Sequence, residues 1–421
     1  MTNIFSCPSY LTPLLRLFSS RGECAYPVGG CVRDTLMGVV PHDWDVAVTS
    51  SPDRTVEICH AAGYRTIPTG LKHGTVTVIV PHSGDPADRE SAYDLIECTT
   101  CRTEGGYSDG RHPDAVSFTG RIEDDLSRRD FTVNAMAFCR ATDGDGLAVL
   151  DLFGGQEDLH NRVIRAVGDP DTRFTEDALR LMRAVRFAVK LGFTIEENTY
   201  AAMARCAHGL ARISRERISE EFQKILTGPE PTRGLSMLTD SGLMPYVLPC
   251  GISSVAAELS SLPAEFPLRM AALLWGLEGE AIEKNLAGLR LPNAVRKDIL
   301  TVTRSVAAEP EDTPYFARRW RSELGELALP ALAVRRACAD GGTVGVDSLA
   351  ELVRASAEKN EPVRICDLAV SGDDLVALGI KPGKHLRELL SELLDAVWTD
   401  PQKNTRETLI SMIKEEQKRK N

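Results

Sequence analysis

The stretch VGGCVRDTLMGVVPHDWDVAV, residues Val28–Val48, joins a glycine pair to two aspartates and decides the fold of the first part of the chain. A Gly-Gly turn lets backbone N–H groups approach a phosphate closely, because no Cβ blocks the way. The run Asp45–Val48 is typical of a strand, whose side chains alternate between two faces. Asp43 and Asp45 are therefore predicted to share one face and to bind Mg²⁺ for nucleotidyl transfer. An Asp-x-Asp pair alone is also typical of exposed acids at a turn.

Length and composition indicate a soluble chain of several domains. A chain of 421 residues suggests about three or four domains of roughly 100–150 residues. No apolar run approaches the roughly 18–20 residues that span a bilayer, and the N-terminus lacks the features of a signal peptide. Eleven irregularly spaced cysteines fit reduced thiols, so the cytoplasm is expected. Cys98 and Cys101 form a C-x-x-C without a second pair, which disfavours zinc.

The charge is uneven along the chain. The net charge of −11 argues against indiscriminate binding of nucleic acid. Residues 160–217, however, hold ten Arg and one Lys against seven acids. This excess fits either a solvated helical face with ion pairs or a positive cleft wall for triphosphate or RNA. Charge alone leaves both interpretations open.

The first ~150 residues have an α/β pattern and the remainder is helical. The expected strands are Cys24–Val28, Asp45–Thr49, Thr75–Val80 and Tyr93–Cys98. A helix over Asp53–Ala62 should be capped by Ser51-Pro52. Beyond Leu152, apolar residues at helical spacing predict helices at Phe174–Leu191, Thr199–Ala207, Glu216–Leu226 and Arg233–Ser241.

A third carboxylate is expected from Glu97, in the segment YDLIECTT. Glu97 lies between Ile96 and Cys98 on a predicted strand and should face away from both. A lone glutamate on a strand usually faces solvent, but a site for two metal ions needs about three carboxylates. Glu97 is therefore a candidate metal ligand and hydroxyl-activating group.

The segment LSRRDFTVNAMAF, Leu126–Phe138, places Arg128 and Arg129 directly before Asp130, with Asn134 four residues later. A helix that begins near Asp130 would gather these side chains at one end. Arginine there could bind a triphosphate through paired N–H groups. The alternative is an N-capping aspartate flanked by two surface arginines.

The segment RFTEDALRLMRAVRF, residues 173–187, predicts a helix that recognises a base. Four polar residues recur every three positions near one face of this helix: Asp177, Arg180, Arg183 and Arg186. Leu181, Val185 and Phe187 are expected on the opposite, core-facing side. The Asp177 carboxylate can accept from the amino group of cytosine or adenine, while Arg180 donates to the ring nitrogen beside it. Uracil and guanine instead present a carbonyl acceptor beside a ring N–H donor. A mismatch costs roughly 1–3 kcal/mol. The alternative, an i,i+3 ion pair, is worth only about 0.2–0.5 kcal/mol.

Together these segments resemble the bacterial class II tRNA nucleotidyltransferases, the CCA-adding enzymes of the DNA polymerase beta-like superfamily. The resemblance covers about residues 25–225 and includes HGTVTV, DLFGGQEDL and SRERISEEF; a weaker likeness continues at Val370–Asp400. It implies an α+β fold whose catalytic nucleotidyltransferase head, residues 1–150, has a mixed β-sheet with helices. A helical neck (151–230), body (231–335) and tail (336–421) follow, and the tRNA acceptor arm lies along the concave side of the family's curved shape.

The resemblance also implies the role of each candidate residue. Asp43 and Asp45 would bind Mg²⁺, and Glu97 would be the third acid. Gly30, Arg33 and Arg129 would contact the phosphates and sugar of the incoming nucleotide. Asp177 and Arg180 would read the base, with Arg183 and Arg186 supporting phosphate or base.

The implied activity is template-independent addition or repair of the 3′-terminal CCA of tRNA from CTP and ATP. Relatives that add only CC lack a flexible loop, which is present here as Arg102–Pro113. An A-only enzyme or a poly(A) polymerase of the same superfamily remains open. A catalytically silent RNA- or nucleotide-binding module is the alternative from another class, and three intact acids argue against it. No membrane partner is expected, and the sequence does not indicate the oligomeric state.

Overall fold

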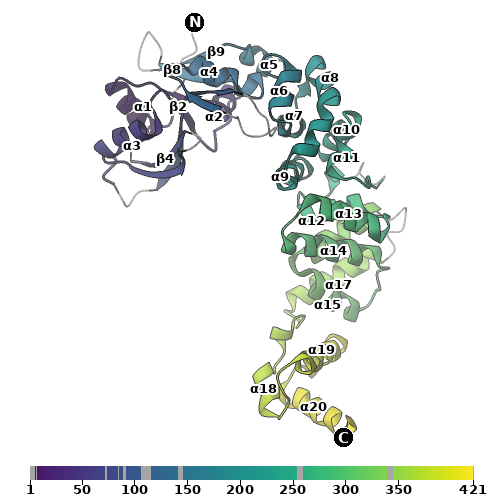
Figure 1. Ribbon diagram of the computed structural model, residues 1–421. Coiled ribbons are helices and arrows are strands. Elements are labelled where there is room, and N and C mark those ends of the chain that lie inside the picture. Colours follow the sequence, from purple (N-terminus) through teal and green to yellow (C-terminus); the bar gives the residue numbers. More distant parts are fainter. Residues whose placement is uncertain are drawn as a thin grey trace. The chain divides into compact units, whose positions relative to one another are not determined.

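The computed structural model describes residues 5, 7–71, 74–83, 85–88, 92–105, 115–140, 146–253, 259–338 and 345–420. The chain forms two compact units, Met1–Val247 and Leu248–Asn421 (Figure 1). Within the described ranges, no helix has the length and apolar character needed to cross a membrane. All eleven cysteines are free thiols. The finer division into head, neck, body and tail remains a prediction.

A five-stranded mixed sheet forms the framework of the first unit, in the order β1-β2-β5-β4-β3. Its strands are β1 (Ala25–Pro27), β2 (Asp45–Val48), β3 (Arg65–Gly70), β4 (Thr75–Pro81) and β5 (Tyr93–Thr100). β2 and β5 run parallel, whereas the other neighbours are antiparallel. The four predicted strands correspond to β1, β2, β4 and β5 within two residues at each end. The prediction missed β3, an edge strand that contains Pro68 and whose pairing with β4 shifts register between Ile67 and Gly70.

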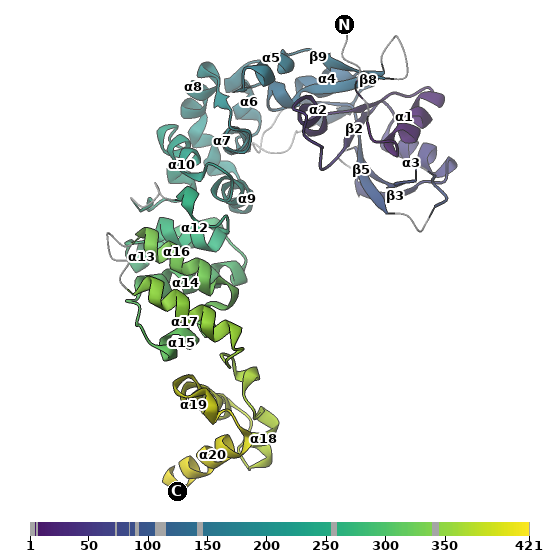
Figure 2. The ribbon, with the colours of Figure 1, turned by 180° about the vertical axis from the view of Figure 1, so that it is seen from behind.

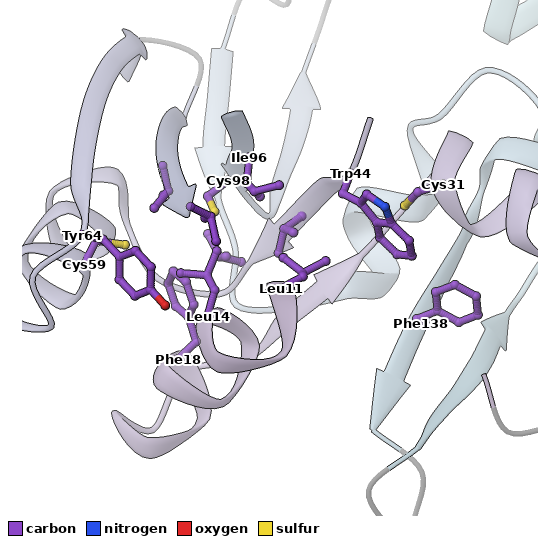
Figure 3. Close-up of a cluster of buried hydrophobic side chains, with 14 of the residues drawn as sticks. Leu11, Leu14, Phe18, Cys31, Trp44, Cys59, Tyr64, Ile96, Cys98 and Phe138 are labelled. Atoms are coloured by element: carbon purple, nitrogen blue, oxygen red, sulfur yellow. The ribbon is translucent and has the colours of Figure 1, made fainter. Parts of the chain in front are cut away.

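One face of this sheet is covered by α1 (Leu11–Ser20) and α3 (Pro52–Ala61). Leu11, Leu14 and Phe18 of α1 are fully buried and share a core with Ile96 and Cys98 of β5 (Figure 3). Side chains alternate along a strand, so the residues between these two face the other way. Glu97 therefore lies on the face opposite the core, as predicted.

Short elements connect the sheet to the helices of the first unit. They are α2 (Gly30–Leu36), β6 (Arg102–Gly105), β7 (Ala115–Phe118), α4 (Ile122–Ser127), β8 (Met136–Arg140), β9 (Leu147–Asp151), α5 (Gly155–His160), β10 (Val163–Ile164) and β11 (Thr194–Ile195). β6 pairs with β7, β8 with β9, and β10 with β11. The predicted loop Arg102–Pro113 thus begins as β6, and its residues 106–113 lie outside the described part of the chain.

The remaining helices of the first unit are α6 (Pro170–Glu176), α7 (Leu179–Leu191), α8 (Glu197–Cys206), α9 (Arg215–Leu226), α10 (Pro231–Asp240) and α11 (Met244–Val247). α3, α8, α9 and α10 begin and end within two residues of the prediction. The Ser51 hydroxyl caps α3 by accepting from the Arg54 N–H at 3.3 Å, as predicted. The predicted continuous helix Phe174–Leu191 is wrong, because the chain leaves the helical conformation at Asp177.

The second unit is helical, as predicted. Its helices are α12 (Phe266–Leu274), α13 (Gly279–Leu289), α14 (Asn293–Ala307), α15 (Pro314–Leu324), α16 (Ala328–Cys338), α17 (Val346–Glu358), α18 (Gly372–Ala377), α19 (Lys384–Thr399) and α20 (Arg406–Lys420). Figure 2 shows α12, α14, α16 and α17 stacked in one block. Arg318 of α15 donates to the Trp398 carbonyl of α19 and so connects these two helices. Arg318 also forms an ion pair with Glu361 at 2.7 Å.

Candidate active site

The glycine pair forms a tight turn between β1 and α2. Gly29 has φ 76° and ψ −124°, a conformation that glycine adopts readily and other residues rarely. A Cβ at Gly29 would lie only 2.6 Å from Arg129 Nη1, whereas one at Gly30 would lie 3.7 Å from Arg33 Nη2. Glycine is therefore required at position 29 rather than at position 30, because a side chain at position 29 would displace Arg129 from the turn.

Asp45 and Glu97 lie side by side on the face of the sheet that is opposite the core. Asp45 begins β2 and is the register partner of Glu97 on the parallel strand β5. The carboxylate of Asp45 keeps access to solvent, but the surrounding protein desolvates it and raises its pKa. The negative charges of Glu97 and Asp43 raise this pKa further, and Arg129 opposes them. A cation would relieve this repulsion between acids, so the donor set fits a divalent metal ion.

Asp43 lies outside the strand, which begins only at Asp45. The Asp43 side chain is 81% exposed, and its Oδ1 lies 2.8 Å from His42 Nδ1. Among the residues that the structure describes, no three His, Cys, Asp or Glu side chains gather closely enough to form a metal cluster. A nucleotide phosphate is the usual source of further oxygen ligands at such sites, because Mg²⁺ is commonly held by one or two carboxylates plus phosphates.

A cavity of about 470 Å³ opens beside Asp45. Most of the residues that line it are polar or charged: Gly29, Gly30, Arg33, Asp45, Arg128, Arg129, Asp130, Asn134, Asp177, Leu179, Arg180, Arg183, Phe187 and Arg217. Seven of the ten predicted site residues are thus brought to one cavity. Asp43, Glu97 and Arg186 are not part of its lining.

Ion pairs hold the arginines of this cavity in place. The buried carboxylate of Asp125 accepts from Arg128 Nη2 at 2.5 Å and from Arg129 Nη2 at 3.0 Å. Arg33 donates to Asn134 Oδ1 at 2.7 Å and pairs with Asp34. Because these guanidinium groups are fixed before a ligand arrives, they lose little conformational entropy on binding phosphate.

The expected helix at Asp130 is wrong. After Asp130 the chain makes a single turn over Thr132–Asn134 and then enters β8. Asp130 does not cap a helix; its Oδ2 accepts from Arg183 Nε at 2.7 Å and its Oδ1 from the Phe131 N–H at 2.9 Å. Burial alone would raise the pKa of Asp130, but Arg183, Arg180 and Asn134 together hold it below its ordinary value.

Asp177 lies in the two-residue break between α6 and α7. Its Oδ1 accepts from the Leu179 N–H at 3.0 Å, and its Oδ2 accepts from Arg217 Nη2 at 3.0 Å. Arg180 pairs instead with Glu176 at 2.6 Å and donates to the Arg173 carbonyl at 3.0 Å. Asp177 and Arg180 therefore line the same cavity without forming the i,i+3 ion pair that was the alternative interpretation.

Phe187 is the centre of a cluster of guanidinium groups. The Cζ atoms of Arg33, Arg183 and Arg186 lie 5.6, 5.3 and 4.4 Å from the centroid of its ring. Leu181 and Val185 are fully buried, as predicted, but Phe187 lines the cavity in addition to packing on the core. Arg186 is not part of the cavity lining and pairs with Glu221 at 3.0 Å.

Comparison with known proteins assigns the chain to a family. The family described as "Poly A polymerase head domain" matches residues 25–165, and "tRNA nucleotidyltransferase domain 2" matches residues 268–413. The chain is 37% identical to the CCA-adding enzyme of Limosilactobacillus fermentum, over 94% of both chains. It is 36% identical to that of Geobacillus kaustophilus, over 96% of this chain and 95% of the relative. This chain belongs to the CCA-adding enzymes.

A solved CCA-adding enzyme has the same fold. The Bacillus stearothermophilus protein, crystallised in complex with CTP, is 29% identical and superimposes with a TM-score of 0.77 over 99% of each chain. The predicted family, the mixed α+β fold and the enzyme class are confirmed. The roles of individual residues remain predictions.

Arg217, Phe187 and Leu179 line the cavity, but the sequence did not indicate a place for them in the site. Arg217 lies in SRERISEEF, a segment that contributed to the family resemblance but was given no function. Its Nη2 binds Asp177, and its buried Nη1 has no hydrogen-bond partner. The signal that could have identified Arg217 is its position four residues, about one helical turn, before the buried Glu221 on an amphipathic helix, which places both on the same face.

Proposed function

We propose that this CCA-adding enzyme builds or repairs the 3′-terminal CCA of tRNA from CTP and ATP, without a nucleic-acid template, and releases pyrophosphate. The observation that carries the proposal is one cavity lined by Asp45, by a cluster of arginines, and by Asp177 with Arg180. A single nucleotide bound there would have its phosphates near the acid and its base near a donor–acceptor pair. The similar Bacillus protein was crystallised with CTP.

In this proposal Glu97 accepts the proton of the terminal ribose 3′-hydroxyl, whose oxygen attacks the α-phosphorus of CTP or ATP. The O3′–phosphorus bond forms while the bond to the β-phosphate oxygen breaks, so pyrophosphate leaves in line with the attack. Mg²⁺ held by Asp43 and Asp45 would neutralise the developing charge. Arg33 and Arg129 bind the phosphates, with Gly30 beside them. Arg183 and Arg186 support the nucleotide less directly, through Asp130 and Phe187.

Base selection would depend on the fixed geometry of Asp177 and Arg180. Each carboxylate oxygen of Asp177 accepts one hydrogen bond from the protein and keeps a lone pair for an exocyclic amino group. Arg180 uses Nη1 and Nη2 to bind Glu176, the Arg173 carbonyl and the Arg128 carbonyl. Its remaining N–H groups can donate to the ring nitrogen of cytosine or adenine. Uracil would place a carbonyl oxygen against the Asp177 carboxylate and be rejected.

A primer-extension assay tests this function and separates it from its alternatives. The purified protein is incubated with tRNA that ends at the discriminator base, with CTP and ATP supplied separately and together. The full activity adds two C residues from CTP alone and CCA from the mixture. An A-only enzyme would add no C, and a poly(A) polymerase would add long A tracts from ATP alone. We place the reaction in the cytoplasm, because eleven free thiols suit a reducing compartment.

The metal assignment is tested by Asp45→Ala. Incorporation should fall by roughly a hundredfold or more, because a ligand of the ion that neutralises the phosphate is lost. The melting temperature and the Kd for tRNA should stay unchanged. Chelation of divalent metal by EDTA should stop incorporation by the wild type, and added Mg²⁺ should restore it. Asp53→Ala, at an exposed position in the first turn of α3, is the matched control. Wild-type turnover by Asp45→Ala would refute the assignment.

A further inference from the structure

We propose that the open face of strands β5, β4 and β3 binds the unpaired 3′ end of the RNA primer. This inference rests on the proposed function and adds a surface to it. The surface consists of Tyr93 and Leu95 on β5 with Arg65 and Ile67 on β3, and we call it the primer face. Tyr93 and Leu95 are each 55% exposed and Ile67 is 41% exposed.

The register of the strands makes the primer face continuous with the catalytic acids. Across the sheet, Asp45 is paired with Glu97, Glu97 with Thr77, and Thr77 with Ile67. Tyr93 and Leu95 lie four and two residues before Glu97, so they point to the same side. Exposed apolar side chains therefore begin directly beside Glu97 and extend away from it.

In the next row of the same face, Leu95 is paired with Ile79, and Ile79 with Arg65. Arg65 thus lies two strands away from Leu95, on the edge strand. The two rows together place apolar side chains and one guanidinium group on the same side of the sheet.

The position of the nucleotide cavity indicates what the primer face binds. The cavity is lined by the turn that follows β1, and β1 and β2 form one end of the strand order. β4 and β3 form the other end, and Asp45 on β2 and Glu97 on the neighbouring β5 lie in the middle of the strand order. Phosphoryl transfer requires the attacking and leaving oxygens to lie on opposite sides of the phosphorus. If pyrophosphate leaves on the cavity side, the attacking 3′-hydroxyl approaches from the side of β4 and β3.

The chemistry of the primer face fits single-stranded RNA. Exposed aromatic and aliphatic side chains offer surfaces on which unpaired bases stack, and arginine binds the backbone phosphates. Arg65 is exposed and makes no ion pair with any residue in the described ranges, so it is available for a phosphate. From Glu97 to Tyr93 the strand extends about 13 Å, which matches about three or four stacked nucleotides at about 3.4 Å each.

Binding of two RNAs that differ only at the end tests this proposal. One is a tRNA ending in CC, and the other is the same tRNA trimmed to a blunt acceptor stem. Wild type should bind the first more tightly, and Tyr93→Ala or Leu95→Ala should reduce this difference by about tenfold. Affinity for the blunt RNA and for CTP should not change, which also shows that the variants are folded. Arg65→Ala should reduce the difference and Arg65→Lys should restore it.

Leu152→Ala is the matched control, because Leu152 is a leucine of the same unit that is 44% exposed and lies outside the cavity and the primer face. The proposal is overturned if wild type binds both RNAs equally, if the variants keep the full difference, or if they weaken both RNAs alike. A change in sedimentation mass in the variants would instead indicate a docking face for a protein. In each case, CCA addition by the same wild-type preparation reports separately whether the proposed function stands.

Discussion

At the scale of single residues, Gly29 is the position where one methyl group should have the largest effect on nucleotide binding. Its φ of 76° disfavours any other residue, and an added Cβ would lie 2.6 Å from Arg129 Nη1, so the Arg129 side chain would have to move. We expect Gly29→Ala to displace Arg129 and to weaken CTP binding by about tenfold, with a stability loss of about 1–3 kcal/mol. Gly30→Ala should lose less CTP affinity and less stability, because its methyl group would make an ordinary contact at 3.7 Å. Calorimetric titration of both variants with CTP checks this, and equal affinities would contradict it.

The ion pair between Asp177 and Arg217 leads to a prediction about base choice. Arg217→Ala removes the group that orients the Asp177 carboxylate, so kcat/KM for CTP and ATP should fall by about tenfold. The preference for CTP over UTP should fall with it. Asp177→Ala should have a larger effect, since the amino group of the base then loses its acceptor, at roughly 1–3 kcal/mol.

Single-nucleotide kinetics on tRNA lacking CCA measure these ratios. Arg217→Lys should restore part of the selectivity, and Arg212→Ala, at an exposed position just before α9, is the control. A CTP-to-UTP ratio that is unchanged in Arg217→Ala would mean that Arg217 has only a structural role.

At the scale of elements, the sequence pattern predicted the strands β1, β2, β4 and β5 and the helices α3, α8, α9 and α10, but not the irregular backbone of the site. Apolar spacing continues through α6 and α7, so it could not reveal the break at Asp177. The break arises because the Asp177 side chain accepts from the Leu179 N–H and competes with the helical hydrogen bond. Asp130 likewise has the sequence of a helix cap, but its true partner, Arg183, is 53 residues away. Pairings of this kind follow from tertiary structure and carry no local signal.

The Asp130–Arg183 pair joins the segment before β8 to α7 and should make stability depend on pH. The pKa of Asp130 is held below its ordinary value, so its ionised form stabilises the fold above about pH 4. This contribution is lost as the pH falls through the lowered pKa. We expect Asp130→Asn to cost about 3 kcal/mol at pH 7, since Arg183 keeps a partly buried charge without its partner.

Urea unfolding at pH 7 and at about pH 3 measures this difference. The difference in unfolding free energy between wild type and Asp130→Asn should narrow at the lower pH, because the Asp130 carboxyl of the unfolded chain takes up a proton at a higher pH than that of the folded chain. Asp53→Asn serves as the exposed control. If this difference in unfolding free energy does not change with pH, Asp130 stabilises the fold through packing and not through its charge.

At the scale of the whole molecule, the arginines of the basic region 160–217 have two kinds of environment. Arg165 and Arg205 pair with Asp158 and Asp171, away from the cavity lining. Arg180, Arg183 and Arg217 line the cavity. The local excess of positive charge therefore divides between structural ion pairs and the lining of the cavity that we propose binds the nucleotide. Charge counting could not separate the two, because both use arginine beside acids.

The division into two compact units predicts that CTP binding and tRNA binding can be separated by truncating the chain. All residues that line the nucleotide cavity belong to Met1–Val247, which has its own hydrophobic core. A chain that ends at Val247 should therefore fold and bind CTP with nearly the wild-type Kd. We propose that the second unit also contacts tRNA phosphates, so the truncated chain should bind tRNA at least roughly tenfold more weakly. That unit contains the match to tRNA nucleotidyltransferase domain 2.

Thermal unfolding, CTP titration and tRNA binding of this truncated chain measure the three properties separately. Introducing Asp177→Ala into the truncated chain should abolish most of its CTP binding, which would show that the nucleotide occupies the described cavity. A truncated chain that unfolds cooperatively but does not bind CTP would mean that the second unit contributes directly to the nucleotide site. Full tRNA affinity in the truncated chain would instead place the main RNA contacts in the first unit, which holds the primer face and the basic region.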